Sequence, residues 1–211
     1  MRRMPPLFSR DRKALRAFHV FNQGFLLDGE RARRIFLDRE DKQFFLELLS
    51  RHLRPEPVTD ARSRPFQHLR AMITLCAFNV MGTHFHLIVW QHDERGIAEL
   101  MDRVKGAYSR YFNDKYGNTA ALFNGPVRAK PIDSPAYFRW LVGYVHDNHR
   151  DGVDYEFSSH RAWLDSDHCP SWLDPEPGVR VFGGLDNYRD HLEMRRAKKQ
   201  LDAELGFRPD W

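Results

Sequence analysis

Two histidines separated by one residue are the feature of this sequence with the clearest chemical use. His84 and His86 lie in the run GTHFHLIVW (82–90), whose apolar and β-branched residues are typical of a strand. In a strand, side chains at i and i+2 share a face, about 6–7 Å apart at Cα. Two neutral imidazoles placed in this way can bind one divalent metal ion, although two surface histidines would show the same spacing.

A helix expected from Ser134 to about Asn148 offers residues that could complete such a site. Tyr144 and Asn148 lie at i and i+4, so they share one face of that helix. The amide oxygen of Asn148 could be a third ligand beside the two imidazoles. Such mixed nitrogen and oxygen ligation suits Mg²⁺ or Mn²⁺ and does not exclude Zn²⁺. His146 and His149 are nearby alternatives, but helical spacing turns both away from the line of Tyr144 and Asn148.

The hydrophobic pattern predicts the elements that position these residues. Apolar or alternating runs predict strands at 17–23, 72–80, 85–90 and 126–133, the last of them a proline-containing edge strand. Apolar residues at helical spacing predict further helices at 41–53, 95–116 and 186–205. This order indicates an α+β fold, with helices packed on one face of a mainly antiparallel sheet and a C-terminal helical extension. We expect one domain over 1–150, with a basic N-terminal arm, and an extension over 151–211.

Composition places the chain among globular proteins. It has 211 residues, of which 42% are hydrophobic and 13% aromatic, enough for a buried core. No run approaches the ~20 apolar residues needed to cross a bilayer, so we expect a cytoplasmic protein with no membrane contact. Cys76 and Cys169 fit neither a disulfide framework nor a zinc motif, and both are expected to be reduced.

Charge is distributed unevenly along the chain. Basic residues outnumber acidic ones in 1–34 and 95–150, whereas 151–211 is acidic. A polyanion such as DNA is a plausible partner for the basic segments, and an ordinary solvated surface would look similar. The residues that we expect to contact DNA are Arg103, Lys105, Arg110 and Lys115 on the long helix, together with Arg128 and Lys130.

The sequence also resembles a known family, the single-tyrosine HUH transposases of the insertion-sequence-200-like group. It is most similar there to the REP-associated tyrosine transposases. The resemblance covers roughly residues 17–165. Its specific part is the His84/His86 pair together with the downstream Tyr144-Val145-His146-Asp147-Asn148 helix. Other runs that look like the family are SRYFNDKYG (109–117) followed by LFNGPVRAKPID, and SSHRAWL (158–164).

This resemblance implies a fold, an activity and a partner. The fold would be that of the HUH endonucleases, which is ferredoxin- or RRM-like. The enzyme would be a metal-dependent transposase that cuts and rejoins single-stranded DNA at hairpins resembling REP elements. Tyr144 would be the nucleophile and would form a 5′-phosphotyrosine link. His84, His86 and Asn148 would hold Mg²⁺ or Mn²⁺. The partner would be single-stranded or hairpin DNA, and the protein a monomer or a homodimer.

The sequence departs from the family pattern at three places. It has Gly125-Pro126-Val127-Arg128 where the family has Gly-Arg-Phe-Lys, and Asn148-His149 where the family has Asn-Pro. The first strand continues into Gln23-Gly24 instead of Arg-Gly. A basic contact to DNA could therefore have moved to Arg128 or Lys130.

Three alternatives stay open. The first is a catalytically inactive, domesticated protein that binds hairpin DNA. The second is a metal-dependent hydrolase of small substrates, which leaves the shared face of Tyr144 and Asn148 without a role. The third concerns the nucleophile, because Tyr108, Tyr111 and Tyr116 are other tyrosines in a basic part of the chain.

Overall fold

Four strands form one antiparallel sheet in the order β4-β5-β1-β6. The computed structural model describes residues 16–27, 29–147 and 155–204. Within them the sheet strands are β1 (Arg16–Gln23), β4 (Ile73–Val80), β5 (His84–Gln91) and β6 (Arg128–Ile132). Two short strands, β2 (Leu26–Leu27) and β3 (Arg31–Ala32), pair separately. All four predicted strands are present, and β6 lies at the sheet edge as its proline predicts.

Helices connect and follow these strands. Their bounds are α1 (Arg39–Leu53), α2 (Gly96–Tyr116), α3 (Pro135–Asp147), α4 (His160–Leu164), α5 (Glu176–Phe182) and α6 (Leu185–Glu204), with a 3₁₀ turn at Ser166–His168. Asp38 and Asp41 form a capping box at the start of α1. Gly117 ends α2 in the left-handed conformation, at φ 61°. The Ser134 Oγ accepts a hydrogen bond of 3.2 Å from the Tyr137 backbone N–H, which marks the predicted start of α3.

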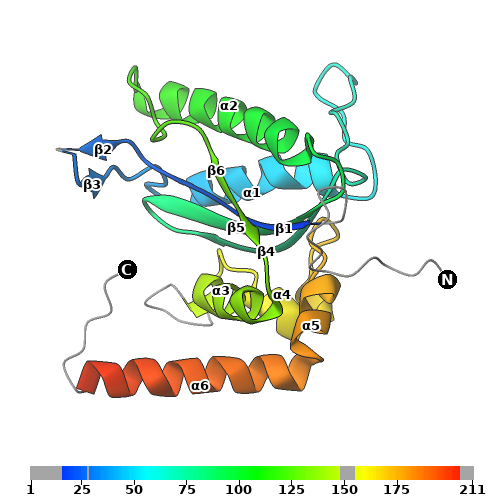
Figure 1. Ribbon diagram of the computed structural model, residues 1–211. Coiled ribbons are helices and arrows are strands. Elements are labelled where there is room, and N and C mark those ends of the chain that lie inside the picture. The colour runs from blue at the N-terminus through cyan, green and yellow to red at the C-terminus, as the bar shows by residue number, and fades with distance from the viewer. Residues whose placement is uncertain (1–15, 28, 148–154, 205–211) are drawn as a thin grey trace.

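The helices cover both faces of the sheet (Figure 1). On one face, α1 and α2 pack against alternate residues of β5, namely Phe85, Leu87 and Val89. On the other face, α3, α5 and α6 bury Ile88 and Trp90 together with other strand residues. The α+β class and the antiparallel sheet are thus confirmed, but the expectation of helices on one face is too narrow. The central strands β4 and β5 are buried on both sides, so each face needs a helical layer.

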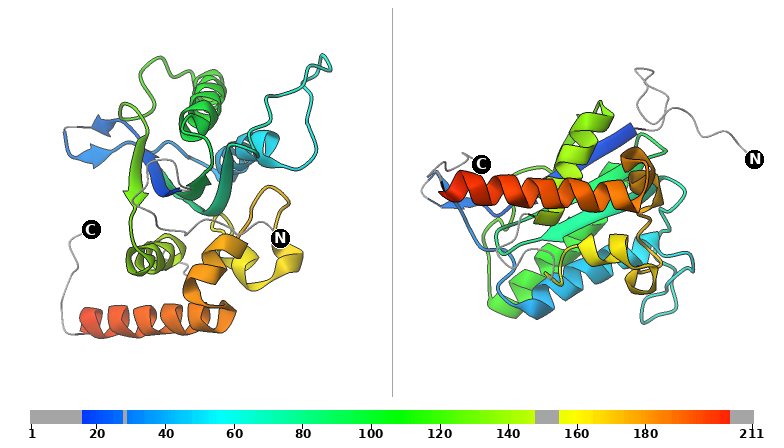
Figure 2. Two further views of the ribbon diagram at one scale, coloured as in Figure 1. Left: turned by 45° about the vertical axis from the view of Figure 1, so that its right-hand side comes forward. Right: turned by 90° about the horizontal axis from the view of Figure 1, so that it is seen from below.

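The segment beyond residue 155 contributes to the second of these cores. Trp163, Phe182 and Tyr188 pack there with Ile88 of β5 and Phe138 of α3. Figure 2 shows α6 running beneath α3, on the side of α3 away from the sheet. A boundary at residue 150 would therefore divide a single hydrophobic core. The predicted C-terminal helix is confirmed, whereas the short helices α4 and α5 were not predicted.

No helix among the described residues combines the length and the apolar character that crossing a membrane requires.

Candidate active site

The two histidines of the sequence motif lie on the sheet face that α3 covers. His84 and His86 alternate with Phe85, whose ring is buried against α1 on the opposite face. The His84 and His86 ring centroids are 5.0 Å apart. His86 is buried, with 7% of its surface exposed, and His84 is half-buried. The strand therefore presents both imidazoles to one side, as their spacing predicts.

Each imidazole uses its Nδ1 atom in a hydrogen bond within the protein. The Nδ1 of His84 is 2.8 Å from Thr83 Oγ1, and the Nδ1 of His86 is 2.8 Å from His19 Nε2. The buried Nε2 of His86 has no hydrogen-bond partner among the described residues. A buried, unpaired nitrogen is costly unless something binds it. Proton placement on Nδ1 would leave Nε2 as a metal ligand on each ring, so the pair fits a divalent cation.

Burial keeps these imidazoles uncharged. Loss of solvation lowers the pKa of His84 to about 4 and that of His86 well below its ordinary value. Neutral imidazole is the form that binds metal ions, so both side chains are ready to act as ligands at neutral pH.

A third histidine, His19 of β1, lies beside this pair and was not among the predicted site residues. We call His19, His84 and His86 the histidine cluster. His19 lies beside His86 across the β1–β5 pairing, with ring centroids 5.0 Å apart. Burial, and secondarily the nearby charge of Lys130, lowers the pKa of His19 to about 4. A neutral His19 can accept the Nδ1 proton of His86 and hold that ring in one tautomer. By strand alternation His19 shares a face with Phe21, but the sequence pattern does not show which strand lies beside β1.

Tyr144 lies at this cluster. Its ring centroid is 5.5 Å from that of His86, in an edge-to-face contact between α3 and β5. The side chain is half-buried. One anchor of α3 is next to it, where the Nδ2 of Asn79 donates a 2.6 Å hydrogen bond to the Val145 carbonyl. Asn79 of β4 is paired with His86 of β5. The hydrogen bond from Asn79 therefore holds α3 close to the histidines.

A buried hydrogen-bond network also attaches α3 to the C-terminal helices. His146 Nδ1 is 2.7 Å from the Tyr188 hydroxyl of α6, and its Nε2 is 2.7 Å from Ser159 Oγ. The Tyr188 hydroxyl is also 2.6 Å from His160 Nδ1. His146 thus faces the core and points away from the histidine pair, as the helical spacing predicts.

The predicted third ligand, Asn148, lies outside the described residues, and so does its alternative His149. Among the residues that are described, no group of three or more His, Cys, Asp or Glu side chains is arranged to hold a metal ion. The described part of the site therefore supplies two imidazoles, and the third ligand stays a prediction.

The alternative nucleophiles lie across the sheet from the histidines. Tyr108 is fully buried and its hydroxyl donates a 2.5 Å hydrogen bond to the Ile35 carbonyl. Tyr111 and Tyr116 contact the carboxylate of Asp41. Burial, together with the carboxylates of Asp38 and Asp41, raises the pKa of Tyr116 to about 12. A hydroxyl that is bound to carboxylates and harder to ionise is a poor nucleophile.

The predicted DNA contacts fall into two groups. Arg128 and Lys130 of β6 lie over the ring of Phe21, the neighbour of His19 and His86, at 6.0 and 5.6 Å. This places both cations beside the histidine cluster. The other four predicted contacts, on α2, lie on the opposite side of the sheet (Figure 1), namely Arg103, Lys105, Arg110 and Lys115.

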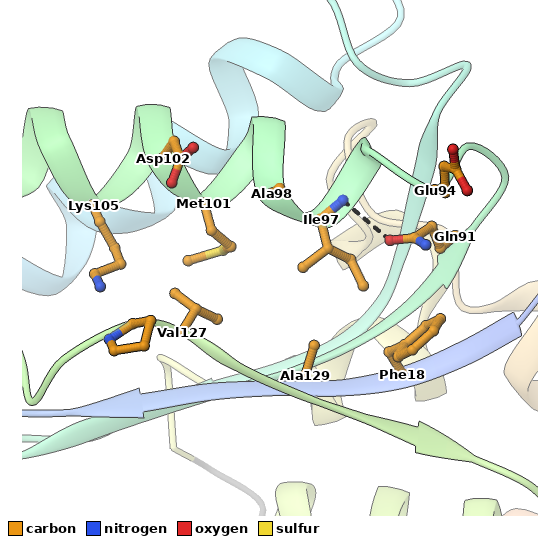
Figure 3. A pocket seen from close by; sticks show the side chains of 11 residues that line it. Phe18, Gln91, Glu94, Ile97, Ala98, Met101, Asp102, Lys105, Val127 and Ala129 are labelled. Carbon is orange, nitrogen blue, oxygen red and sulfur yellow. Dashed lines mark hydrogen bonds between the residues drawn. The ribbon is translucent and has the colours of Figure 1, made fainter.

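The α2 residues are partly engaged within the protein. Arg103 forms an ion pair of 2.7 Å with Glu99. The Lys105 ammonium donates to the Gly125 carbonyl at 2.9 Å, at one end of a cavity of about 450 Å³ between α2, β1 and β6 (Figure 3). Apolar side chains such as Met101 and Val127 line this cavity, and none of the clustered histidines does.

Lys115 is expected to be a structural residue. Its ammonium contacts Asp38, Glu40 and Asp41 at 2.9, 2.8 and 3.0 Å, and its hydrogen bond is the main cause that lowers the pKa of Asp38 to about 2. Lys115→Met should lower the free energy of unfolding by about 1–2 kcal/mol, because the buried Asp41 loses its cation. Urea denaturation measures this, with Arg110→Met, an exposed change on the same helix, as the control. Unchanged stability together with weaker DNA binding would instead indicate a DNA contact.

Comparison with known proteins agrees with this geometry. Residues 67–145 match the family model described as "Transposase IS200 like", and the matched span contains both strand histidines and Tyr144. The predicted enzyme class, a transposase, is thereby confirmed. Over these residues the chain is similar to the insertion-sequence-200-like transposases.

The chain is similar to the solved structure of a REP-associated tyrosine transposase bound to a REP hairpin, with 13% sequence identity and a TM-score of 0.49, over 82% of this chain and 92% of that one. No curated protein matches the chain.

Proposed function

We propose that this protein is a metal-dependent transposase that cleaves and rejoins single-stranded DNA at hairpins through a covalent bond to Tyr144. The observation that carries the proposal is the contact between two elements that are far apart in the chain. The Tyr144 ring of α3 lies 5.5 Å from the His86 ring of β5, on the face that also presents His84. The family match supports the DNA substrate, and the hairpin is taken from the sequence resemblance.

The residues proposed to hold the metal ion are His84 and His86, through Nε2, with the amide oxygen of Asn148. The unpaired, buried Nε2 of His86 supports this assignment. A divalent ion such as Mg²⁺ or Mn²⁺ would supply Lewis-acid stabilisation of the charge that develops on the phosphate. The hydrogen bond from His86 to His19 would hold the ligand ring in place.

In the proposed reaction, the Tyr144 hydroxyl oxygen forms a bond to the scissile phosphorus. The bond from phosphorus to the 3′-oxygen breaks, the tyrosine releases its proton, and the 3′-oxygen gains one. The product is a 5′-phosphotyrosine and a free 3′-hydroxyl. A second strand's 3′-hydroxyl can attack this phosphotyrosine and restore a phosphodiester, so no external energy source is needed. Arg128 and Lys130 would neutralise backbone phosphates near the cluster.

The test is formation of a covalent adduct. The purified protein is incubated with single-stranded hairpins from its own genomic flanks and Mn²⁺, and the mixture is separated on a denaturing gel. A band in which DNA migrates with the protein, and which disappears with EDTA, is the expected result. Hairpin binding without an adduct under any divalent metal would instead indicate the catalytically inactive hairpin-binding protein. Absence of DNA affinity would contradict both.

The third ligand is tested by Asn148→Ala. Removing one of three protein ligands should raise the Mn²⁺ concentration for half-maximal adduct formation about tenfold or more. Asn148→Asp keeps an oxygen ligand and should retain activity or need less Mg²⁺, because a carboxylate is a harder ligand. Normal cleavage by Asn148→Ala at low metal concentration would direct the search to His149.

A further inference from the structure

One side of α3 carries a ladder of three parallel aromatic rings that ends at Tyr144. Tyr137 and Trp140 have centroids 6.0 Å apart with planes at 15°. Trp140 and Tyr144 are 5.6 Å apart with planes at 5°. Tyr144 in turn contacts His86. We call these three rings the α3 aromatic ladder.

The ladder lies at the border of the core that packs α3 on the sheet. Tyr137 and Tyr144 pack against that core, and Trp140 is exposed beside it. The fully buried apolar side chains of the helix are others, namely Phe138, Leu141, Val142 and Val145. Trp140 is 38% exposed, and the two tyrosines are half-buried. A row of flat rings that reaches solvent is a surface for stacking.

The charges around the ladder suit a polyanion. The Arg195 guanidinium of α6 lies 5.8 Å from the Trp140 ring. Within α3 the first acidic residue is Asp147, and Lys199 of α6 lies 3.5 Å from its carboxylate. Positive charge from α6 therefore reaches one side of the ladder, while Arg128 and Lys130 are near its Tyr144 end, next to His19 and His86.

We propose that the α3 aromatic ladder binds unpaired bases of single-stranded DNA next to the scissile phosphate, with Arg195 contacting the backbone. This inference rests on the proposed function and adds the site that holds the strand. Aromatic platforms flanked by cations are the usual means of binding single strands without sequence preference. The seven helical steps from Tyr137 to Tyr144 rise about 10 Å, which accommodates about three bases at a spacing of ~3.4 Å. Paired bases inside a duplex cannot stack there, so the ladder selects single strands.

The experiment measures binding of a fluorescein-labelled oligothymidine by anisotropy, in EDTA so that no cleavage occurs. Trp140→Ala should weaken Kd by about fivefold to a hundredfold, the range for loss of one stacked base. Trp140→Phe keeps a ring and should stay within a few-fold of the wild type. Arg195→Gln should reduce the salt dependence of Kd by about one ion, whereas Trp140→Ala should leave that slope unchanged.

Phe66→Ala is the matched control. Phe66 is also a partly exposed ring with a guanidinium over it, that of Arg51 at 5.4 Å, but it packs at α1 on the other side of the sheet. This variant should bind oligothymidine as the wild type does. Circular dichroism of each variant verifies the fold. As a direct map, 5-iodouracil in the oligonucleotide should photocross-link to Trp140 or Tyr137.

The outcomes separate the inference from the proposed function. An adduct with hairpin DNA, combined with equal Kd for Trp140→Ala and wild type, would overturn the ladder and leave the transposase intact. Trp140-dependent binding without any adduct under Mn²⁺ would support the ladder and contradict the enzyme. Cross-links confined to α2, or no oligothymidine binding by the wild type, would also overturn the ladder.

Discussion

Tyr144→Phe is expected to bind hairpin DNA as tightly as the wild type and to form no covalent adduct. The substitution removes one oxygen and keeps the ring that contacts His86 and Trp140. Packing and stacking should therefore survive, while the atom that bonds to phosphorus is gone. Loss of a nucleophile typically costs several powers of ten in rate, so the adduct should fall below detection. The measurement pairs a denaturing gel with a binding titration on the same preparation.

Tyr111→Phe provides the comparison for this result. Tyr111 lies on α2, where its hydroxyl contacts Asp41, and its loss should leave the adduct in place. Mass spectrometry of peptides from the trapped wild-type adduct should locate the nucleotide on Tyr144. Attachment at Tyr108, Tyr111 or Tyr116, or an adduct that persists in Tyr144→Phe, would show that the assignment is wrong.

Replacement of either strand histidine should remove metal binding. His84→Ala or His86→Ala leaves one imidazole in place, so the affinity for Mn²⁺ measured by calorimetry should fall by about a hundredfold or more, and adduct formation should fall with it. His86→Ala also leaves His19 without its hydrogen-bond partner, and some loss of stability is expected there. Calorimetry reports binding even if the enzyme is inactive for another reason.

His92→Ala controls for the loss of a histidine as such. His92 directly follows β5, is exposed, and contacts Thr74. Its replacement should leave the Mn²⁺ affinity unchanged. Equal affinity in His84→Ala and in the wild type would rule out the proposed ligand pair.

Features that depend on local periodicity could be predicted from the sequence. The shared face of His84 and His86 follows from the two-residue repeat of a strand, and the start of α3 from Ser134 and Pro135. His19 could not be placed in the same way. Its contact with His86 depends on which strand pairs with β5 and in which register, and neither is encoded within a short window of sequence.

The role of a basic residue on a helix likewise cannot be predicted from the sequence alone. In the sequence, Lys115 was indistinguishable from a DNA contact, because a solvated cation and a DNA-binding cation have the same local pattern. Its carboxylate partners come from Asp38, Glu40 and Asp41 at the start of α1. Likewise, Arg195 lies in a segment that is acidic overall, and only the packing of α6 brings it to Trp140. Such pairings require the tertiary structure.

The attachment of α3 to α6 bears on the order in which the protein matures as it is synthesised. The strands that carry His19, His84 and His86 leave the ribosome early, whereas Tyr188 is made near the end. Until then His146 lacks its hydroxyl partner, and the core that seats α3 lacks Phe182 and Leu192. A chain that ends before α6 would therefore contain the strand histidines without the residues that hold α3 and Tyr144 in place. If Tyr144 is the nucleophile, we expect polypeptides that end before α6 not to cleave DNA.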